Sequence, residues 1–251
     1  MESYATAQQV FAAGLIFSRL GAIIMLIPGL GETFVPPRIR LALALSLALM
    51  LLPVLTPAIP VLPTTVSGMA GAVIKELAIG LLVGSIIRMF MSSLAAAGEV
   101  MSIQTTLAFA QTANPTQASP STTLGTFLGL IGVLLVMTTD LHHMFIAAIV
   151  KSYTLFPFTR PLPVADAGAL AIQTVSRSFA LGIQLAAPVI VFSMVFNIAV
   201  GLVGRVMPQF QIFFVASPLM VLMGLSIFGL SLGTIGMVWL DHYRDLVRLF
   251  G

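Results

Sequence analysis

The residues with the clearest capacity for chemistry are a carboxylate and two imidazoles close together in the chain, Asp140, His142 and His143. Such groups are common ligands of first-row metals, and imidazoles also transfer protons near neutral pH. On one continuous helix, neighbouring residues point about 100° apart, so only Asp140 and His143 are expected to share a face. No second histidine–carboxylate cluster is present to complete a site. We therefore expect no metal ligands and no cofactor in this chain.

A second pattern is the Gly-x-Ser-x-Gly motif of Gly229–Gly233, with Ser231 as its candidate nucleophile. A hydrolase of this type needs the serine on a sharp turn between a strand and a helix. Here the motif lies inside an apolar segment, where glycines four residues apart usually allow helices to pack closely. The chain also has no cysteine, which excludes disulfides and thiolate chemistry. The sequence predicts a protein without catalytic residues, with an intramembrane hydrolase at Ser231 as the weakest alternative.

Charged residues in or beside apolar segments form a third group. Each costs about 2.5–3.5 kcal/mol at the centre of a bilayer. Two of them, Lys75 and Glu76, have no opposite charge three or four residues away, so their partners must come from other segments or other subunits. We assign this group to structural or inter-subunit pairing, whereas a proton relay is the alternative. The group comprises Arg19, Lys75, Glu76, Arg88, Glu99, Asp140 and, at the end of a segment, Arg205.

The composition defines the elements that must position these residues. The 251 residues are 59% hydrophobic and only 8% charged, too few polar side chains to cover a soluble globule. The net charge of +3 is spread thinly, without the basic clusters of a nucleic-acid-binding surface. Glu2 stands where a removable signal peptide would carry basic residues, so we expect none. The sequence predicts an all-α integral membrane protein that binds lipid and no nucleic acid.

About six apolar segments are long enough to be membrane helices. The third has no helix breaker as far as Ala110 and predicts one helix roughly 60 Å long, about twice the hydrocarbon thickness. Prolines from Pro53 onward are expected to end the second. Basic residues flank the segments too evenly to set an orientation. The segments are Val10–Leu30, Leu41–Leu62, Gly68–Met91, Leu124–Val150, Phe179–Gly204 and Ile212–Leu240.

Two further features concern helix packing. Phe179–Leu240 predicts an antiparallel helical hairpin whose tip follows Arg205 and contains Pro208 and Gln209. Glycines at four-residue spacing indicate close helix approaches, within the chain or between chains. These pairs are Gly80 with Gly84, Gly125 with Gly129, and Gly229 with Gly233.

The tract Gln111–Thr123 stands out because it has neither a charge nor a bulky apolar side chain. Pro115 and Pro120 prevent it from forming a regular helix. Irregular polar backbone is tolerated at membrane depth only where protein buries it or where it lines a wet cavity. The tract is therefore either an external loop or part of a pore.

Four stretches in order along the chain carry a family resemblance. The set resembles the FliR/SctT family of type III secretion export-gate proteins, and the overall match favours the flagellar branch. Ser102 and Thr106 depart from it, since that family often has glycine at these positions. The stretches are Pro28–Arg40; Ala97–Glu99 followed by Gln104, Phe109, Ala110, Asn114 and Pro115; Asp140–His143 leading to Pro157; and Arg205–Gln209 leading to Pro218.

The resemblance implies a non-enzymatic subunit of an export gate. It implies a single domain over residues 1–251, with a FliP-like part, 1–150, joined to a FliQ-like helical hairpin, 178–251. It also implies assembly with FliP and FliQ around a channel for unfolded flagellar proteins, beside FlhB and FlhA, in the bacterial inner membrane at the flagellar basal body. The loop over 109–123 would plug that channel, through Phe109, Gln111, Asn114, Pro115 and Pro120.

A proton-coupled small-molecule permease, with Asp140 and Glu99 as the titrating groups, is the alternative function. It would explain why carboxylates lie beside apolar segments at all. Such a permease would work alone, whereas a gate subunit would require its partner chains.

Overall fold

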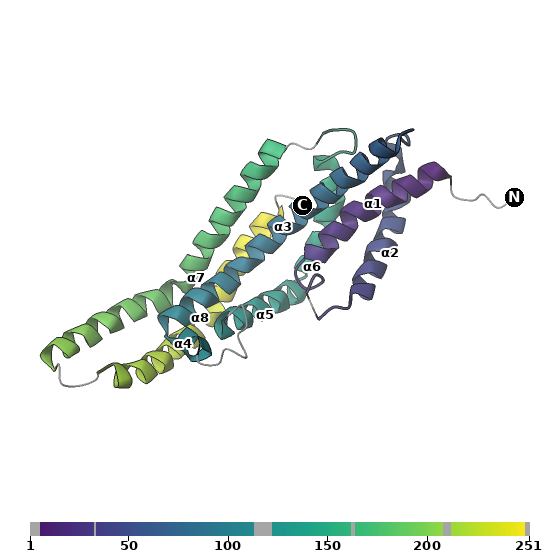
Figure 1. The fold of residues 1–251 in the computed structure, drawn as a ribbon. Coiled ribbons are helices and arrows are strands. Elements are labelled where there is room, and N and C mark those ends of the chain that lie inside the picture. Colours follow the sequence, from purple (N-terminus) through teal and green to yellow (C-terminus); the bar gives the residue numbers. More distant parts are fainter. Residues whose placement is uncertain (1–5, 33, 113–121, 162–163, 208–211, 249–251) are drawn as a thin grey trace. The chain divides into compact units, whose positions relative to one another are not determined.

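The computed structural model describes residues 6–32, 34–112, 122–161, 164–207 and 212–248. Within these ranges the chain is helical and contains no strand, which confirms the all-α prediction. The α-helices, labelled in Figure 1, are α1 (Ala7–Leu26), α2 (Pro37–Leu55), α3 (Val66–Gln104), α4 (Leu107–Thr112), α5 (Thr123–Thr138), α6 (Leu141–Leu155), α7 (Val164–Val206) and α8 (Ile212–Arg248). A 3₁₀ turn, η1 (Thr56–Ala58), follows α2.

Among the described residues, five helices are long and apolar enough to cross a membrane. They are α1, α2 with η1, α3, α7 and the Phe214–Asp245 part of α8. The shorter helices α5 and α6, separated by a break, make a sixth span if they are counted together. The prediction of an integral membrane protein with about six apolar helical segments is confirmed.

Two of the predicted segments are wrong in their continuity. Leu124–Val150 is not one helix, because Asp140 has φ 57° and ψ 15° and its left-handed backbone separates α5 from α6. The third segment is helical from Val66, but it stops at Gln104 instead of continuing to Ala110. At 39 residues, α3 is about 58 Å long. Thr106, with φ 60°, then separates it from α4.

The second segment also runs differently from the prediction. Pro53 lies inside α2, and the helix continues to Leu55 before η1 begins. Proline removes one backbone hydrogen bond and crowds the preceding turn, and α2 ends two residues after Pro53. Pro37 occupies the first turn of α2, where its missing N–H would have no helical partner.

The chain divides into two compact units. The first comprises residues 1–90, 136–175 and 244–251, and the second comprises 91–135 and 176–243. The division into FliP-like residues 1–150 and FliQ-like residues 178–251 rests on the resemblance alone and stays a prediction. Figure 1 shows the helices of both units, coloured along the sequence.

In the first unit, glycines bring α1 and α3 together. A Cβ built on Gly80 would lie 2.5 Å from the carbonyl oxygen of Arg19, and one on Gly84 would lie 2.9 Å from the Cβ of Leu26. Real Cβ atoms do not approach so closely, so only glycine fits at both positions. The Gly80–Gly84 pair therefore serves helix approach, as its spacing indicates.

A buried charge network lies beside this crossing. Nε of Arg19 donates to Oε2 of Glu76 at 2.7 Å, and both side chains are almost fully buried, at 0% and 2% exposure. The two terminal nitrogens of Arg19 donate to the carbonyls of Ser152 and Phe156, at 3.0 and 2.8 Å. The guanidinium also lies 4.3 Å from the centre of the Tyr153 ring. The network connects α1, α3 and the end of α6.

The second unit is built around the last part of α3. Nε1 of Trp239 in α8 donates to Oγ of Ser93 at 3.1 Å, and both residues are buried. Oγ of Ser193 in α7 donates to Oε1 of Gln104 at 2.8 Å. Consecutive helices α7 and α8 run antiparallel in this unit (Figure 1), as the predicted hairpin requires. Its predicted tip residues Pro208 and Gln209 lie outside the described residues.

Replacing Glu76 with alanine should strongly destabilise the protein. The variant leaves a buried guanidinium without its carboxylate, a change that typically costs about 3–5 kcal/mol. Thermal unfolding of the purified protein in detergent measures the loss. The double variant Arg19→Met/Glu76→Leu removes both charges and should recover most of it.

Arg88→Ala is the matched control, because Arg88 and Glu32 lie 3.8 Å apart with side chains 46% and 28% exposed. Exposed ion pairs contribute less than about 1 kcal/mol. Equal melting temperatures for Glu76→Ala and Arg88→Ala would contradict the importance of the buried network.

Candidate functional site

The polar tract that the sequence singles out is held at both ends within the second unit. Its first residues belong to the short helix α4, and its last two are Thr122 and Thr123, where α5 begins. The tract residues Asn114, Pro115 and Pro120 lie outside the described residues. The geometry of the two ends therefore defines the site.

At the downstream end, the Glu99 carboxylate binds the backbone of the tract. Oε1 of Glu99 accepts a hydrogen bond from the amide of Thr122 at 2.7 Å. The Thr122 hydroxyl in turn accepts from the amide of Gly125 at 3.1 Å, and so caps the first turn of α5. Hydrogen bonds to a charged acceptor are stronger than neutral ones. The chain is thus fixed to α3 at the point where it enters α5.

This contact depends on a very close crossing of α3 and α5. A Cβ built on Gly98 would lie 2.5 Å from the Cα of Gly125, and one on Gly125 would lie 2.7 Å from Oε1 of Glu99. Two glycines facing each other let the helix backbones touch, which brings the Glu99 side chain within reach of Thr122. Any side chain at either position would separate the helices.

At the upstream end, α3 stops at a two-residue turn. The Thr105 hydroxyl donates to the carbonyl of Met101 at 2.9 Å, and the amide of Thr106 donates to the carbonyl of Ile103 at 3.2 Å. Thr106 then adopts φ 60°, a left-handed conformation that is rare for a β-branched residue. The side chain of Thr105 is packed so tightly on Gly224 of α8 that a Cβ there would overlap it. The turn is therefore held against α8.

A cavity of about 520 Å³ lies beside this turn in the second unit. The buried hydroxyl of Thr106 borders it and has no hydrogen-bond partner among the described residues. Its walls are otherwise largely apolar and come from α7 and α8: Phe196, Asn197, Val200, Phe214, Ala216, Ser217, Pro218 and Met220. The turn that leads into the polar tract thus borders open space on one side.

Between these ends, the described part of the tract is helical. Phe109 lies in α4 with 69% of its side chain exposed, and its amide donates to the carbonyl of Thr106 at 3.2 Å. Gln111 belongs to the same helix. The prediction of non-helical backbone is therefore wrong for Gln111 and Thr112, which precede the first proline.

Five of the six other charged residues singled out by the sequence belong to the first unit, whereas the tract belongs to the second. In the first unit, Nζ of Lys75 donates to the carbonyl of Phe158 at 2.6 Å, and Arg88 lies 3.8 Å from Glu32. Asp140 is 3.8 Å from Nδ1 of His143, and both side chains are exposed. Arg205 is exposed in the last turn of α7. Of the seven charged residues, only Glu99 bonds to the tract in the described part of the chain.

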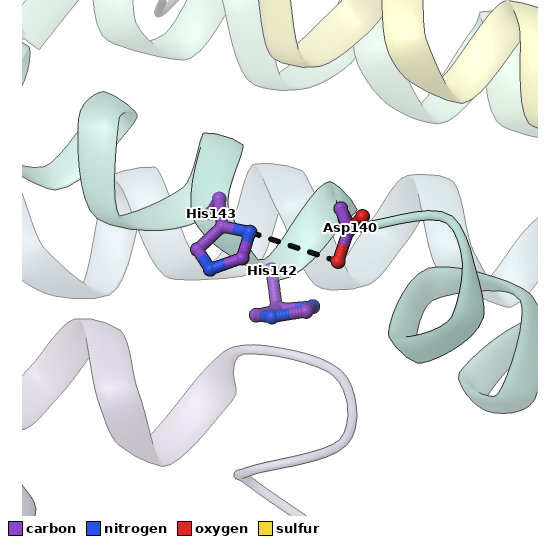
Figure 2. Close-up of side chains that lie close together, drawn as sticks. All are labelled: Asp140, His142 and His143. Atoms are coloured by element: carbon purple, nitrogen blue, oxygen red, sulfur yellow. Dashed lines mark ion pairs between the residues drawn. The ribbon is translucent and has the colours of Figure 1, made fainter.

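The Asp140 cluster differs from the expected geometry. A carboxylate oxygen of Asp140 and one nitrogen each from His142 and His143 all lie within 4.8 Å of one another. The two imidazole centres are 4.2 Å apart, and Figure 2 shows the three side chains grouped at the start of α6. The expectation that His142 would point away is wrong, because Asp140 precedes α6 in a left-handed conformation and the helix is not continuous through it.

Ser231 lies inside α8, where its hydroxyl donates to the carbonyls of Ile227 and Phe228 at 2.8 and 3.0 Å. The strand-to-helix turn of a hydrolase nucleophile is missing at this position. A Cβ built on Gly229 or Gly233 would meet no atom within 4 Å, so among the described residues these glycines make no close helix contact. The same holds for Gly129, whereas Gly125 makes the crossing described above.

Sequence reasoning missed several residues that shape the site. Thr122 and Gly98 form the downstream contact, and Thr105 with Gly224 forms the upstream one. Their types gave little signal, since isolated threonines and glycines are frequent in membrane helices. The adjacent Gly98 and Glu99 were the one visible hint, because glycine beside a carboxylate in an apolar helix allows both close approach and a hydrogen bond.

Taken together, the chain is an all-α integral membrane protein with a polar tract anchored between its helices. A sequence model of the family described as "Bacterial export proteins, family 1" matches residues 10–246, and the chain belongs to this family. The match confirms the resemblance drawn from the four ordered stretches.

Curated relatives agree with this membership. The chain is 59% identical over 250 residues to the flagellar biosynthetic protein FliR of Caulobacter vibrioides, with 100% of both chains covered. It is 28% identical to FliR of Aquifex aeolicus, over 94% of this chain and 91% of the relative. It is also 28% identical to FliR of Escherichia coli K12, over 83% and 79% respectively. The protein is therefore a membrane component of the flagellar export apparatus.

Gly98→Ala should destabilise the second unit, because the added methyl group must overlap the α5 backbone. Overpacking of this kind costs about 1–3 kcal/mol. Gly129→Ala is the matched control on α5, since its Cβ would meet no atom within 4 Å. That variant should be neutral or stabilising by up to about 1 kcal/mol. Thermal unfolding in detergent compares the two, and similar melting temperatures would contradict the proposed crossing.

Proposed function

We propose that this protein forms, with FliP and FliQ, the channel through which unfolded flagellar subunits are exported, and that residues 109–123 plug that channel when it is closed. The observation that carries the proposal is the anchoring of the polar tract at both ends. Membership of the export family supports a role in protein export, and the anchors hold the two described ends of the tract.

The chemistry of the tract suits a plug. Its residues are uncharged, so moving them aside breaks no ion pair within the tract. At its downstream end a single carboxylate, Glu99, holds one backbone amide. At its upstream end Thr106 is in a sparsely populated conformation beside a cavity of about 520 Å³. A change of φ and ψ at this residue would let α4 swing while α3 keeps its helical hydrogen bonds.

The partner chains are inferred from surface chemistry together with the family. In the apolar 18-residue windows of α2 with η1 and of α7, only 11% and 17% of the residues are buried within the chain. Neighbouring exposed side chains on α7 are large and apolar, among them Val191, Met194 and Val195. Surfaces of this kind contact lipid or other membrane helices. FliP and FliQ are the proposed neighbours, with FlhB and FlhA beside the channel.

The role is proposed to be non-enzymatic, in the bacterial inner membrane at the flagellar basal body. Export of a polypeptide requires a channel and a means of closing it. The residues assigned above are proposed to close the channel or to hold the closing segment in place. Ser231 is proposed to serve helix structure, since its hydroxyl bonds to carbonyls of its own helix. Unchanged motility in Ser231→Ala would agree with that assignment.

Deleting residues 114–120 should open the closed channel. With the middle of the plug removed, ions can cross the assembled complex, and we expect a several-fold rise in conductance. Planar-bilayer recording of the complex reconstituted with FliP and FliQ measures it. Unchanged conductance together with unchanged secretion would reject the plug.

A matched pair at Glu99 tests the anchor separately. Glu99→Ala removes the acceptor for the Thr122 amide and should raise the leak, whereas Glu99→Gln keeps a carbonyl oxygen at that place and should leak less. Equal ion leakage in the two variants would contradict the proposal that Glu99 anchors the plug.

Purification from native membranes should recover the protein in a complex with two smaller helical membrane proteins. The large apolar area left open on α2 and α7 favours stable association with other chains. Mass spectrometry of the purified complex identifies them. A protein that purifies alone and transports protons or small solutes in liposomes would instead support the permease alternative.

A further inference from the structure

Asp140, His142 and His143 form a cluster at the start of α6 that the export function does not use. The three lie in the first unit, apart in sequence from the polar tract and its anchors. Figure 2 shows the His143 ring turned toward the Asp140 carboxylate, with His142 beside both. We propose that the cluster binds a divalent first-row transition metal, with zinc as the representative ion.

The distances suit such an ion. Zinc bonds of about 2.0–2.2 Å place neighbouring ligand atoms of a tetrahedral centre about 3.3–3.6 Å apart. Oδ1 of Asp140 and Nδ1 of His143 are 3.8 Å apart, and one ligand atom from each of the three residues lies within 4.8 Å of the others. Small side-chain rotations bring all three to bonding distance. Carboxylate and imidazole ligands together favour zinc and its neighbours over calcium or magnesium.

The backbone at the start of α6 positions the Asp140 carboxylate beside the imidazole of His143. Asp140 occupies the position that caps α6, where an aspartate usually accepts a hydrogen bond from an amide of the first turn. No such side-chain bond forms here, and the amide of His143 donates instead to the backbone carbonyl of Asp140 at 3.0 Å. The left-handed conformation at φ 57° leaves the carboxylate facing the imidazole. Strained residues of this kind gather at functional sites.

The two imidazoles supply the second observation. Nδ1 of His142 is buried and has no hydrogen-bond partner among the described residues. The ring centres of His142 and His143 are 4.2 Å apart, so the two imidazoles lie beside each other. Imidazole nitrogens are common ligands of first-row metals. The exposed side chains of Asp140 and His143 leave room for water to complete the coordination.

A bound ion would join Asp140 to the first turn of α6 and so stabilise the break between α5 and α6. The site stands independently of the channel proposal, because all three of its residues belong to the first unit and the polar tract and its anchors belong to the second. A negative result in the plug experiments would therefore not argue against the metal site.

Zinc titration calorimetry of the full chain, purified with a histidine-free tag, tests the proposal. We expect one zinc per chain, and binding at least about tenfold weaker in His142→Gln/His143→Gln and in Asp140→Asn. Zinc should also raise the melting temperature of the wild type and not that of the variants. Circular dichroism without zinc checks that the variants keep their helices.

His242→Gln is the matched control, because the chain has three histidines and His242 belongs to α8 in the second unit, its Nδ1 2.8 Å from the carbonyl of Val238. It should bind zinc as the wild type does. Wild-type zinc binding no stronger than that of His142→Gln/His143→Gln, or loss of binding in His242→Gln, would overturn the site.

Discussion

The contact between the Glu99 carboxylate and the Thr122 amide is the interaction on which the site depends. An amide outside a helix in a membrane protein needs a partner, and a carboxylate at 2.7 Å provides a strong one. It is possible only because Gly98 and Gly125 let α3 and α5 touch. The Gly98–Gly125 crossing thus allows the Glu99 carboxylate to bind the Thr122 amide, at the point where the polar tract ends and α5 begins.

The first unit also contains a carboxylate that bonds across a helix crossing, although its partners are of a different kind. Glu76 and Arg19 lie deep among apolar side chains, where either charge alone would be very costly. Glu76 binds only Nε of Arg19. The two terminal nitrogens donate to two carbonyls near the end of α6, and the guanidinium lies over the face of the Tyr153 ring. Both units therefore pair a glycine-mediated helix crossing with a carboxylate that bonds across it, although the carboxylates bond to different groups.

Hydropathy was sufficient to predict the helix class and about six apolar membrane segments, because these depend on local composition. The breaks at Thr106 and Asp140 were not predictable, since left-handed residues are set by their surroundings and neither is glycine. Partner choice was also beyond the sequence: Glu76 needed a charge from another segment, but only the fold identifies Arg19.

The Arg19 network also has a consequence for the order of biosynthesis. Arg19 lies 57 residues before Glu76, and 133 and 137 residues before the carbonyls of Ser152 and Phe156. All of these acceptors lie later in the chain than α1, so each of them is synthesised after it. The arginine must stay hydrated, at the insertion machinery or at the lipid headgroups, until α3 and later α6 emerge. Burial of α1 is therefore a late step of folding, although this helix is the first to be made.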